Sequence, residues 1–345
     1  MILDTGRYAC SVEMCPHSTD RLVVGTYQLD EAQGLREGDL QVYQVGGGDG
    51  APSRKSTLEM TSGVLDCKWS ATPVEDGGRP LLACGLAEGS LALVQGCIGE
   101  EDTVAVLEQT EARGHLYLSV DWNDRRESRV DKKVVVSEAS GEVAVWSLAQ
   151  DRMELLQRWD AHQLCGCPSE VWIAAFNAFD DNVALSGADD ACLKIWDLRQ
   201  AGEGGAAVMI PRQHDAGVTT LCWCPTEEHL FVSGSYDEHI RLWDIRSPRQ
   251  PITSCHVNGG VWRLKWHSTR PLLASASMHR GATVVSTAES SLKVLHEYQD
   301  HDSMAYGIDW CPGGTSTSIA SCSFYDHALH FWEVPDAGGA LAGGC

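Results

Sequence analysis

The sequence predicts an all-β fold, a seven-bladed β-propeller, and three observations lead to this prediction. A strand-turn-strand unit that closes with Trp-Asp occurs twice, at residues 186–197 and 233–244. Short β-type runs that end in a bulky residue recur every 43 to 55 residues, and repetition near this period is typical of propeller blades. No segment of useful length carries the 3.6-residue apolar period of a helix.

Each predicted blade opens with a short first strand that ends in an aromatic or otherwise bulky residue. The seven opening residues are Met14, Trp69, Trp122, Phe176, Trp223, Trp266 and Trp310. The last three intervals fit the roughly 40–45 residues of a four-stranded WD40 blade, and the longer early intervals leave room for loops. We therefore predict one WD40 propeller domain over residues 1–334 and a flexible tail over 335–345. Exposed insertions are expected at 31–39, 46–63 and 200–207.

Composition excludes several classes of function. The formal net charge of −22 argues against recognition of nucleic acid through its phosphates, which requires a basic surface. This charge favours a cationic partner or serves solubility. Apolar runs are too short to span a membrane and the first residues do not read as a leader, so we expect a cytoplasmic protein. The 14 cysteines are expected to be free thiols, and Cys165-Gly166-Cys167 lacks metal-site spacing, so no metal is predicted.

Two sets of four polar residues are predicted to brace blades four and five. In WD40 repeats a His before the blade, a Ser in its second strand, an Asp in the next turn and a Trp in its third strand hydrogen-bond in series. The residues at these places are His162, Ser186, Asp190 and Trp196 in blade four, and His214, Ser233, Asp237 and Trp243 in blade five. Satisfied buried polar groups of this kind fix blade geometry, so we assign them structural roles.

The sixth blade departs from this pattern. When the blades are aligned on their Trp-Asp ends, the Asp position recurs as Asp326 in blade seven but is His279 in blade six. Val285 stands where the Trp is expected. Two interpretations are open: the repeat has drifted, or His279 serves another function.

A second pattern concerns the residue four places before each opening residue. First strands border the central channel of a propeller, so these seven "rim positions" are expected at one end of the channel. They are Cys10, Leu65, Leu118, Trp172, Thr219, Trp262 and Tyr306. Any single aromatic residue there is explained by core packing, but three in the last four blades resemble a ring of π faces. Such rings bind cations, with about 0.5–2 kcal/mol from each good contact.

Five stretches carry a resemblance to a known family: residues 172–177, 234–239, 259–267, 278–281 and 306–310. They resemble the diphthine methyltransferase family, the WD-repeat methylesterases of diphthamide biosynthesis. The similarity is strongest from Trp159 to Trp332, and in the N-terminal third it rests mainly on pattern. Gly-Ser-x-Asp marks any WD40 blade, whereas Gly-Gly-Val-Trp-Arg and Met-His-x-Gly are much more specific.

The resemblance implies a carboxylic-ester hydrolase. Its substrate is methylated diphthine, a modified histidine of translation elongation factor 2 that carries a trimethylammonium group beside a methyl ester. Hydrolysis gives diphthine and methanol before the final amidation to diphthamide. An aromatic rim suits the quaternary ammonium of this substrate. We expect a monomer that acts on elongation factor 2 without a cofactor, a membrane or direct contact with nucleic acid.

The sequence does not identify the nucleophile, because it contains neither a Gly-x-Ser-x-Gly elbow nor a metal cluster. We hypothesise that His279 is the general base for a water molecule and that Tyr306 or Arg263 stabilises the oxyanion. The residues predicted to bind the substrate are Trp172, Trp262, Tyr306, Glu238 and Asp309. Two alternatives remain: a non-catalytic scaffold for protein interactions, which most WD40 propellers are, and a reader of methyl-ammonium groups.

Overall fold

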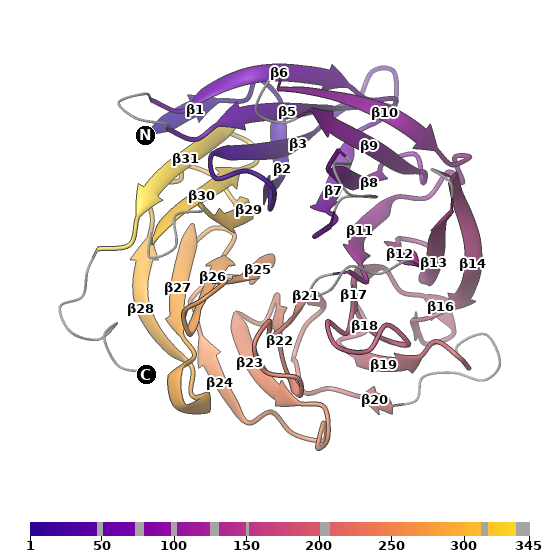
Figure 1. The fold of residues 1–345 in the computed structure, drawn as a ribbon. Coiled ribbons are helices and arrows are strands. Elements are labelled where there is room, and N and C mark those ends of the chain that lie inside the picture. Colours follow the sequence, from indigo (N-terminus) through magenta and orange to yellow (C-terminus); the bar gives the residue numbers. More distant parts are fainter. Residues whose placement is uncertain are drawn as a thin grey trace.

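The computed structural model describes residues 1–46, 51–72, 79–97, 102–124, 131–149, 152–200, 208–311 and 317–335. Within these ranges the chain is almost entirely β-strand, and seven antiparallel sheets surround a central channel (Figure 1). The predicted seven-bladed propeller is therefore confirmed.

Blades one to three hold the first part of the chain, in strand order from the channel outward. Blade one consists of β2 (Tyr8–Met14), β3 (Arg21–Asp30), β5 (Asp39–Gln44) and β6 (Ser53–Glu59), and β4 (Leu35–Glu37) pairs with the end of β3. Blade two consists of β7 (Val64–Trp69), β8 (Leu81–Leu86), β9 (Leu91–Cys97) and β10 (Thr103–Gln109). Blade three consists of β11 (Tyr117–Trp122), β12 (Lys132–Glu138), β13 (Glu142–Ala149) and β14 (Arg152–Asp160).

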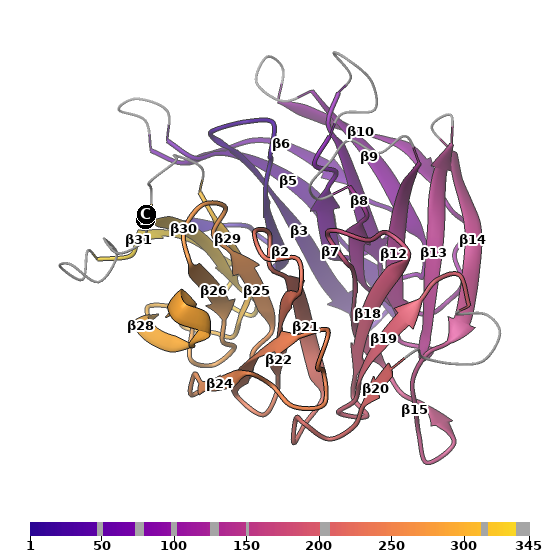
Figure 2. The same ribbon diagram turned by 60° about the horizontal axis from the view of Figure 1, so that its bottom comes forward.

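Blades four and five follow a small hairpin, β15 (Gln163–Leu164) with β16 (Cys167–Pro168), which projects at one end of the propeller (Figure 2). Blade four consists of β17 (Val171–Phe176), β18 (Val183–Ala188), β19 (Leu193–Asp197) and β20 (Val208–Ile210). Blade five consists of β21 (Val218–Trp223), β22 (Leu230–Ser235), β23 (His239–Asp244) and β24 (Thr253–His256).

Blades six and seven close the ring. Blade six consists of β25 (Arg263–Trp266), β26 (Leu272–Ala276), β27 (Ala282–Ser286) and β28 (Lys293–Tyr298), with the 3-10 turn η1 (Ala288–Ser290). Blade seven consists of β29 (Ala305–Trp310), β30 (Ser318–Ser323), β31 (Ala328–Glu333) and, as its outer strand, the N-terminal β1 (Ile2–Asp4). The first and last parts of the chain thus share one sheet, with Leu3 opposite Leu329 (Figure 1).

The hydrophobic core lies between neighbouring blades. The first strand of every blade ends at its predicted opening residue, and among these Trp69, Trp122 and Phe176 are fully buried. Phe176 of blade four, for example, shares a buried cluster with Val135 of blade three. Each opening residue therefore joins two sheets, which is why bulky residues recur at this place.

The structure corrects two of the three predicted insertions. Residues 46–63 contain β6, the outer strand of blade one, and residues 31–39 contain β4, so both segments carry sheet structure that their Gly-rich or charged composition did not indicate. Residues 201–207 lie outside the described residues, as does the predicted tail beyond Pro335.

Candidate functional site

A β-bulge places the rim-position residue in six of the seven blades. The pairing of the first and second strands skips Cys10, Leu65, Leu118, Trp172, Thr219 and Tyr306. Trp262, the seventh, immediately precedes β25 and donates its backbone N–H to Ala276. Bulges re-aim a side chain relative to the strand, so the same local irregularity sets this residue at the channel mouth in each blade.

The structure brings together the three aromatic residues predicted from the rim positions. The rings of Trp172 and Trp262 have centroids 5.3 Å apart at an interplanar angle of 61°. Trp262 stacks on Tyr306, with centroids 4.7 Å apart at 26°. All three side chains are half-buried, so part of each ring remains accessible to a ligand.

Further rings that the sequence analysis missed extend this group. Tyr236 lies 6.1 Å from both Trp172 and Trp262, and Phe324 lies 5.1 Å from Tyr306. Tyr8 stacks on Phe324 at 4.7 Å and continues the group into blade one. We call these six residues the aromatic arc: Trp172, Tyr236, Trp262, Tyr306, Phe324 and Tyr8. Tyr236 and Phe324 each follow the second strand of a blade, so comparing that place between repeats offered a signal for them.

The polar sets of blades four and five form the expected hydrogen-bond series. In blade four Trp196 donates to Ser186 Oγ at 2.8 Å, Ser186 bonds His162 Nε2 at 2.7 Å, and His162 Nδ1 bonds Asp190 at 2.9 Å. In blade five the corresponding distances through Trp243, Ser233, His214 and Asp237 are 2.8, 2.7 and 3.0 Å. Burial lowers the pKa of both histidines. In each blade Nδ1 faces the carboxylate and Nε2 faces the serine hydroxyl, and in blade five Arg241 also contacts His214 Nδ1.

Blade seven corrects one sequence alignment. His301 bonds Ser321 Oγ at 2.7 Å and Ser323 Oγ at 2.8 Å, and Trp332 donates to Ser321 at 3.0 Å. Ser323 therefore occupies the place in this series that was assigned to Asp326. Asp326 lies three residues farther along, in the turn between β30 and β31.

Blade six replaces the series with apolar packing. Val257 and Val285 are completely buried in one cluster, at the places held by His214 and Trp243 in blade five. Ser275 contacts Ser277 at 3.0 Å, and Ser277 donates to Thr283 at 3.2 Å, so the remaining hydroxyls satisfy one another. Blade six forms its four strands without the Asp and His of this series. The residue at the Asp position therefore has no structural hydrogen bond to a histidine of the series.

His279 is that residue, and its side chain is exposed. It lies in the turn after β26, beside Met278, whose backbone forms a β-bridge with Ala305. Ala305 precedes Tyr306, so the turn that carries His279 is fastened next to the aromatic arc. Met278 has φ of +44°, which is unusual for a residue with a side chain and marks this turn as strained.

The other predicted site residues lie away from the arc. Glu238 pairs with His256 of the outer strand β24, with Oε2 and Nε2 3.0 Å apart. Asp309 is inside the channel, where it accepts from the backbone N–H of Met14 at 2.9 Å and faces Lys265 at 3.4 Å. The structure therefore places neither carboxylate beside the aromatic rings.

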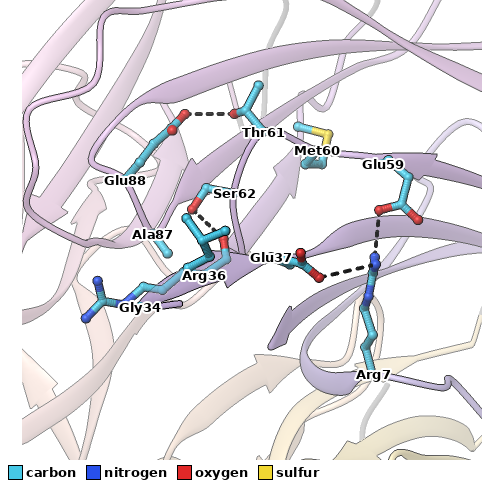
Figure 3. Close-up of a pocket in the computed structure, with 11 residues that line it drawn as sticks. Arg7, Gly34, Arg36, Glu37, Glu59, Met60, Thr61, Ser62, Ala87 and Glu88 are labelled. Atoms are coloured by element: carbon cyan, nitrogen blue, oxygen red, sulfur yellow. Dashed lines mark hydrogen bonds and ion pairs between the residues drawn. The ribbon is translucent and has the colours of Figure 1, made fainter. Parts of the chain in front are cut away.

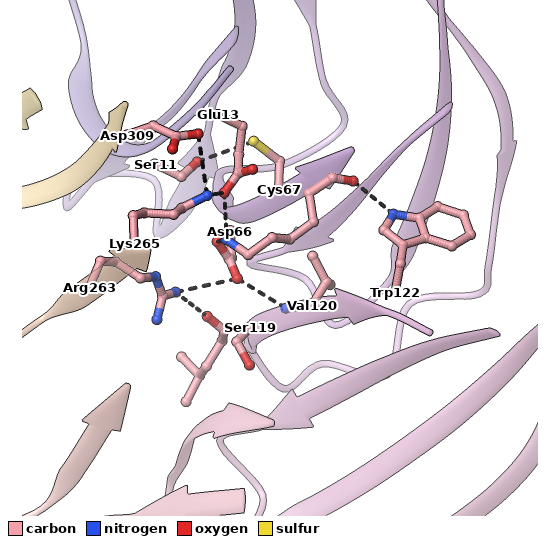
Figure 4. Close-up of polar contacts among 12 residues, drawn as sticks. Ser11, Glu13, Asp66, Cys67, Ser119, Val120, Trp122, Arg263, Lys265 and Asp309 are labelled. Carbon is pink, nitrogen blue, oxygen red and sulfur yellow. Dashed lines mark hydrogen bonds and ion pairs between the residues drawn. The ribbon is translucent and has the colours of Figure 1, made fainter. Parts of the chain in front are cut away.

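Arg263 directly follows Trp262 in sequence and is buried, and its guanidinium points toward Asp66 (Figure 4). Its guanidinium reaches Asp66 at 3.4 Å and the carbonyls of Leu118 and Thr219 at 3.4 and 3.5 Å. It thereby ties blade six to blades two, three and five. These contacts involve both terminal nitrogens, Nη1 and Nη2, of the guanidinium that the sequence analysis assigned to an oxyanion.

Beneath Arg263 the channel holds a network of opposite charges. Glu13 accepts from Lys68 at 2.6 Å and also from Lys265, which joins blades one, two and six (Figure 4). Burial raises the pKa of Asp309 above its ordinary value, although Lys265 acts against this. A cavity of about 430 Å³, walled by Trp69, Trp223 and other ends of the first strands, opens from here at the face opposite the arc.

A second pocket lies on the same face as the arc, in blades one and two (Figure 3). Its volume is about 430 Å³. Arg7 bonds Glu59 at 2.7 Å and Asp39 at 2.8 Å there, and Thr61 donates to Glu88 at 2.7 Å. Arg7 thus pairs with the nearby carboxylates, and the pocket is polar.

In the described ranges no three His, Cys, Asp or Glu side chains gather as metal ligands do, and Cys165 and Cys167 are free and exposed. No helix in the same ranges is long and apolar enough to cross a membrane.

Comparison with known proteins places the chain in a family. The WD domain, G-beta repeat family matches residues 153–197, 206–244 and 249–284. The human protein named diphthine methyltransferase is 33% identical over 343 residues, which are 89% of this chain and 73% of that protein. The Dictyostelium discoideum diphthine methyltransferase homolog is 30% identical, over 93% of this chain and 95% of its own length. The chain belongs to the diphthine methyltransferase family.

The predicted family is thereby confirmed, and the fold has a solved counterpart. The Schizosaccharomyces pombe diphthine methyltransferase is 28% identical over 93% of this chain and 94% of its own length. A chain in the "Crystal Structure of Mitotic Checkpoint Complex" superposes with a TM-score of 0.72 at 18% identity, covering 97% of this chain and 91% of that chain. At this identity the likeness shows the propeller fold alone.

Proposed function

We propose that this protein is a carboxylic-ester hydrolase that removes the methyl ester of methylated diphthine on translation elongation factor 2. Membership in the diphthine methyltransferase family supports a role in diphthamide biosynthesis. The observation that carries the proposal is the joining of Trp172, Trp262 and Tyr306 into one half-buried group of rings at the channel mouth. Rings of this kind attract a quaternary ammonium, which cannot be recognised by hydrogen bonds.

In the proposed reaction a water molecule attacks the ester carbonyl carbon while the imidazole of His279 accepts one of its protons. The electron pair of the carbonyl moves onto oxygen, where the O–H of Tyr306 donates to the oxyanion. The bond to the methoxy oxygen then breaks, and that oxygen takes the proton from His279 and leaves as methanol. The acid product ionises to the carboxylate of diphthine.

Two features of the site support these roles. Burial, then the neighbouring Tyr325 and Cys10, raise the pKa of Tyr306 to about 12, so its phenol keeps the proton that it must share. Burial also raises the pKa of Cys10 far above its ordinary value, which makes this thiol at the same mouth a poor nucleophile. A water activated by His279 therefore fits better than a cysteine nucleophile. Arg263 acts in this proposal by supporting the floor of the site.

The test is release of methanol from elongation factor 2 that carries methylated diphthine. We expect purified protein to catalyse this release, and His279→Ala to lower kcat by about 10²–10⁴, the range of general-base catalysis. His115→Ala, which removes an exposed histidine in blade three, is the matched control and should leave kcat unchanged. Full turnover by folded His279→Ala would refute the role of this residue. Binding of the modified factor without turnover by the unaltered protein would instead favour a reader or scaffold.

A further inference from the structure

At one end of the aromatic arc two carboxylates lie against the rings. Asp189 directly follows β18, and Glu170 directly precedes β17. The backbone N–H of Asp189 donates to the carbonyl of Glu170 at 3.1 Å, which fixes the two segments side by side. The indole N–H of Trp172 donates to Asp189 Oδ1 at 2.6 Å, so the ring and the carboxylate are oriented together.

A glycine allows this carboxylate to approach the next ring. A side chain at Gly217 would begin 2.6 Å from Asp189 Oδ1 and 3.2 Å from Tyr236 Cδ2. Both contacts are closer than ordinary packing permits, so Asp189 and Tyr236 meet across Gly217 only because it has no Cβ. At Gly260, by contrast, a Cβ would lie 2.7 Å from the sulfur of the flexible Met278 side chain and 3.6 Å from Tyr236, which is an ordinary packing distance.

Three rings around these carboxylates face one another at steep angles. Trp172 and Tyr236 are 6.1 Å apart at 88°, Tyr236 and Trp262 are 6.1 Å apart at 50°, and Trp172 and Trp262 are 5.3 Å apart at 61°. Rings that all packed flat would present only edges to solvent. Inclined rings that are half-buried present parts of several faces to one small volume, as in aromatic cages for methylated ammonium groups.

The two carboxylates of Asp189 and Glu170 place negative charge at this end of the arc. Burial and then the charge of Asp189 raise the pKa of Glu170, as expected for adjacent like charges. Among the described residues, no Lys, Arg or His forms a salt bridge with Asp189 or Glu170. A bound cation would supply the missing positive charge, and one without N–H donors would match the ring faces better than an ammonium that needs hydrogen bonds.

We propose that Trp172, Tyr236 and Trp262, with Asp189 and Glu170, form a binding site for quaternary ammonium groups. The identity of its natural ligand, the trimethylammonium of methylated diphthine, rests on the proposed function. The site itself rests on the rings, the carboxylates and Gly217. It assigns the anionic role to Asp189 and Glu170, in place of the Glu238 and Asp309 expected from the sequence. Tyr306, stacked on the far side of Trp262, then lies where an ester beside the ammonium needs a donor.

The test uses probes that contain no ester. Choline carries a quaternary ammonium, and 3,3-dimethyl-1-butanol is its neutral isostere. We expect choline to quench tryptophan fluorescence with a Kd at least tenfold below that of the isostere. Asp189→Asn and Glu170→Gln should each raise the Kd for choline about fivefold and leave the isostere unaffected, because each removes one charge near the cation. Asp302→Asn, which alters an exposed carboxylate at the entry to blade seven, is the matched control with unchanged affinity.

Equal affinity for the two probes, or no binding of choline by the unaltered protein, overturns this site. Unchanged choline affinity in both carboxylate variants overturns the role of Asp189 and Glu170. The experiments distinguish failure of the esterase proposal from failure of this site. If choline binding depends on Asp189 but no methanol is released, the esterase proposal is wrong and the binding site is still supported. Conversely, if Asp189→Asn releases methanol with an unchanged KM, the binding site is refuted and the esterase proposal is still supported.

Discussion

Replacing Tyr306 by Phe tests the oxyanion role with little change to the structure. The substitution keeps the ring that stacks on Trp262 at 4.7 Å and contacts Phe324 at 5.1 Å, and it deletes only the phenol oxygen. The hydrogen bond recorded for that oxygen is a weak one, to the Met304 sulfur at 4.0 Å. Stability should therefore change by no more than about 0.5 kcal/mol.

The effect on catalysis should be far larger. Loss of one oxyanion donor costs about 10²–10³ in kcat, or about 2.7–4 kcal/mol of transition-state stabilisation. KM should stay within about twofold, because the hydroxyl gains its partner only when the oxyanion forms. With the pKa of Tyr306 raised to about 12, its ionisation should not limit the rate of the unaltered protein anywhere below pH 9.

The assay is methanol release under saturating and subsaturating substrate, with urea unfolding of the same preparations. Tyr325→Phe is the matched control, since Tyr325 belongs to the same blade and is 57% exposed. Its kcat should equal that of the unaltered protein. A Tyr306→Phe enzyme that keeps kcat within threefold refutes the reasoning, and an equal loss in Tyr325→Phe would attribute the effect to the blade as a whole.

Two further predictions concern stability. Burial and the adjacent His330 lower the pKa of His301 to about 3. The contribution of His301 to the free energy of unfolding is therefore complete above its unfolded-state pKa of about 6.5 and is lost as the pH falls below that value. Between pH 7 and 5 this loss is about 2 kcal/mol. The free energy of unfolding, measured with urea, should therefore depend less steeply on pH in His301→Gln than in the unaltered protein. An equal dependence on pH would contradict the assignment. In the second, Ser233→Ala should cost about 2–3 kcal/mol, because it removes the hydroxyl partner of two buried nitrogens, His214 Nε2 and Trp243 Nε1. The same change at Ser275 in blade six should cost about 1 kcal/mol, because it removes a single hydroxyl contact, and equal losses would contradict the view that blade six has no polar series.

The parts of the fold that repeat were predictable from the sequence. Opening residues such as Trp122 recur because each must fill the space between two sheets, and the His214 series recurs because its four members satisfy one another within a single blade. Rim positions were found by counting back from those residues. Counting succeeded because the bulge skips one residue at the same distance from the opening residue in each of the six blades that have a bulge.

The parts that depend on ring closure were not predictable. Pairing of β1 with β31, and the contact of Glu13 with Lys265, join residues that are far apart in the chain and carry no local signal. The outer strand β6 was missed because its sequence is polar on both faces, as expected of an exposed edge strand. Asp326 was misassigned because the repeat pattern predicts an aspartate beside the histidine, whereas in blade seven a serine, Ser323, contacts His301.

The carboxylate partners of the rings show most clearly why sequence proximity misled. Glu238 is two residues from Tyr236, yet a turn with positive φ at Glu238 directs it to His256 on the outer edge. Asp309 is three residues from Tyr306, but this distance along a strand carries it down into the channel. Asp189 is 17 residues from Trp172, and the antiparallel pairing of β17 with β18 brings it within hydrogen-bond distance. In a propeller the neighbours of a rim residue are thus the ends of the paired strand, and a search for ligand-binding residues should compare those ends between blades before it considers residues that adjoin in sequence.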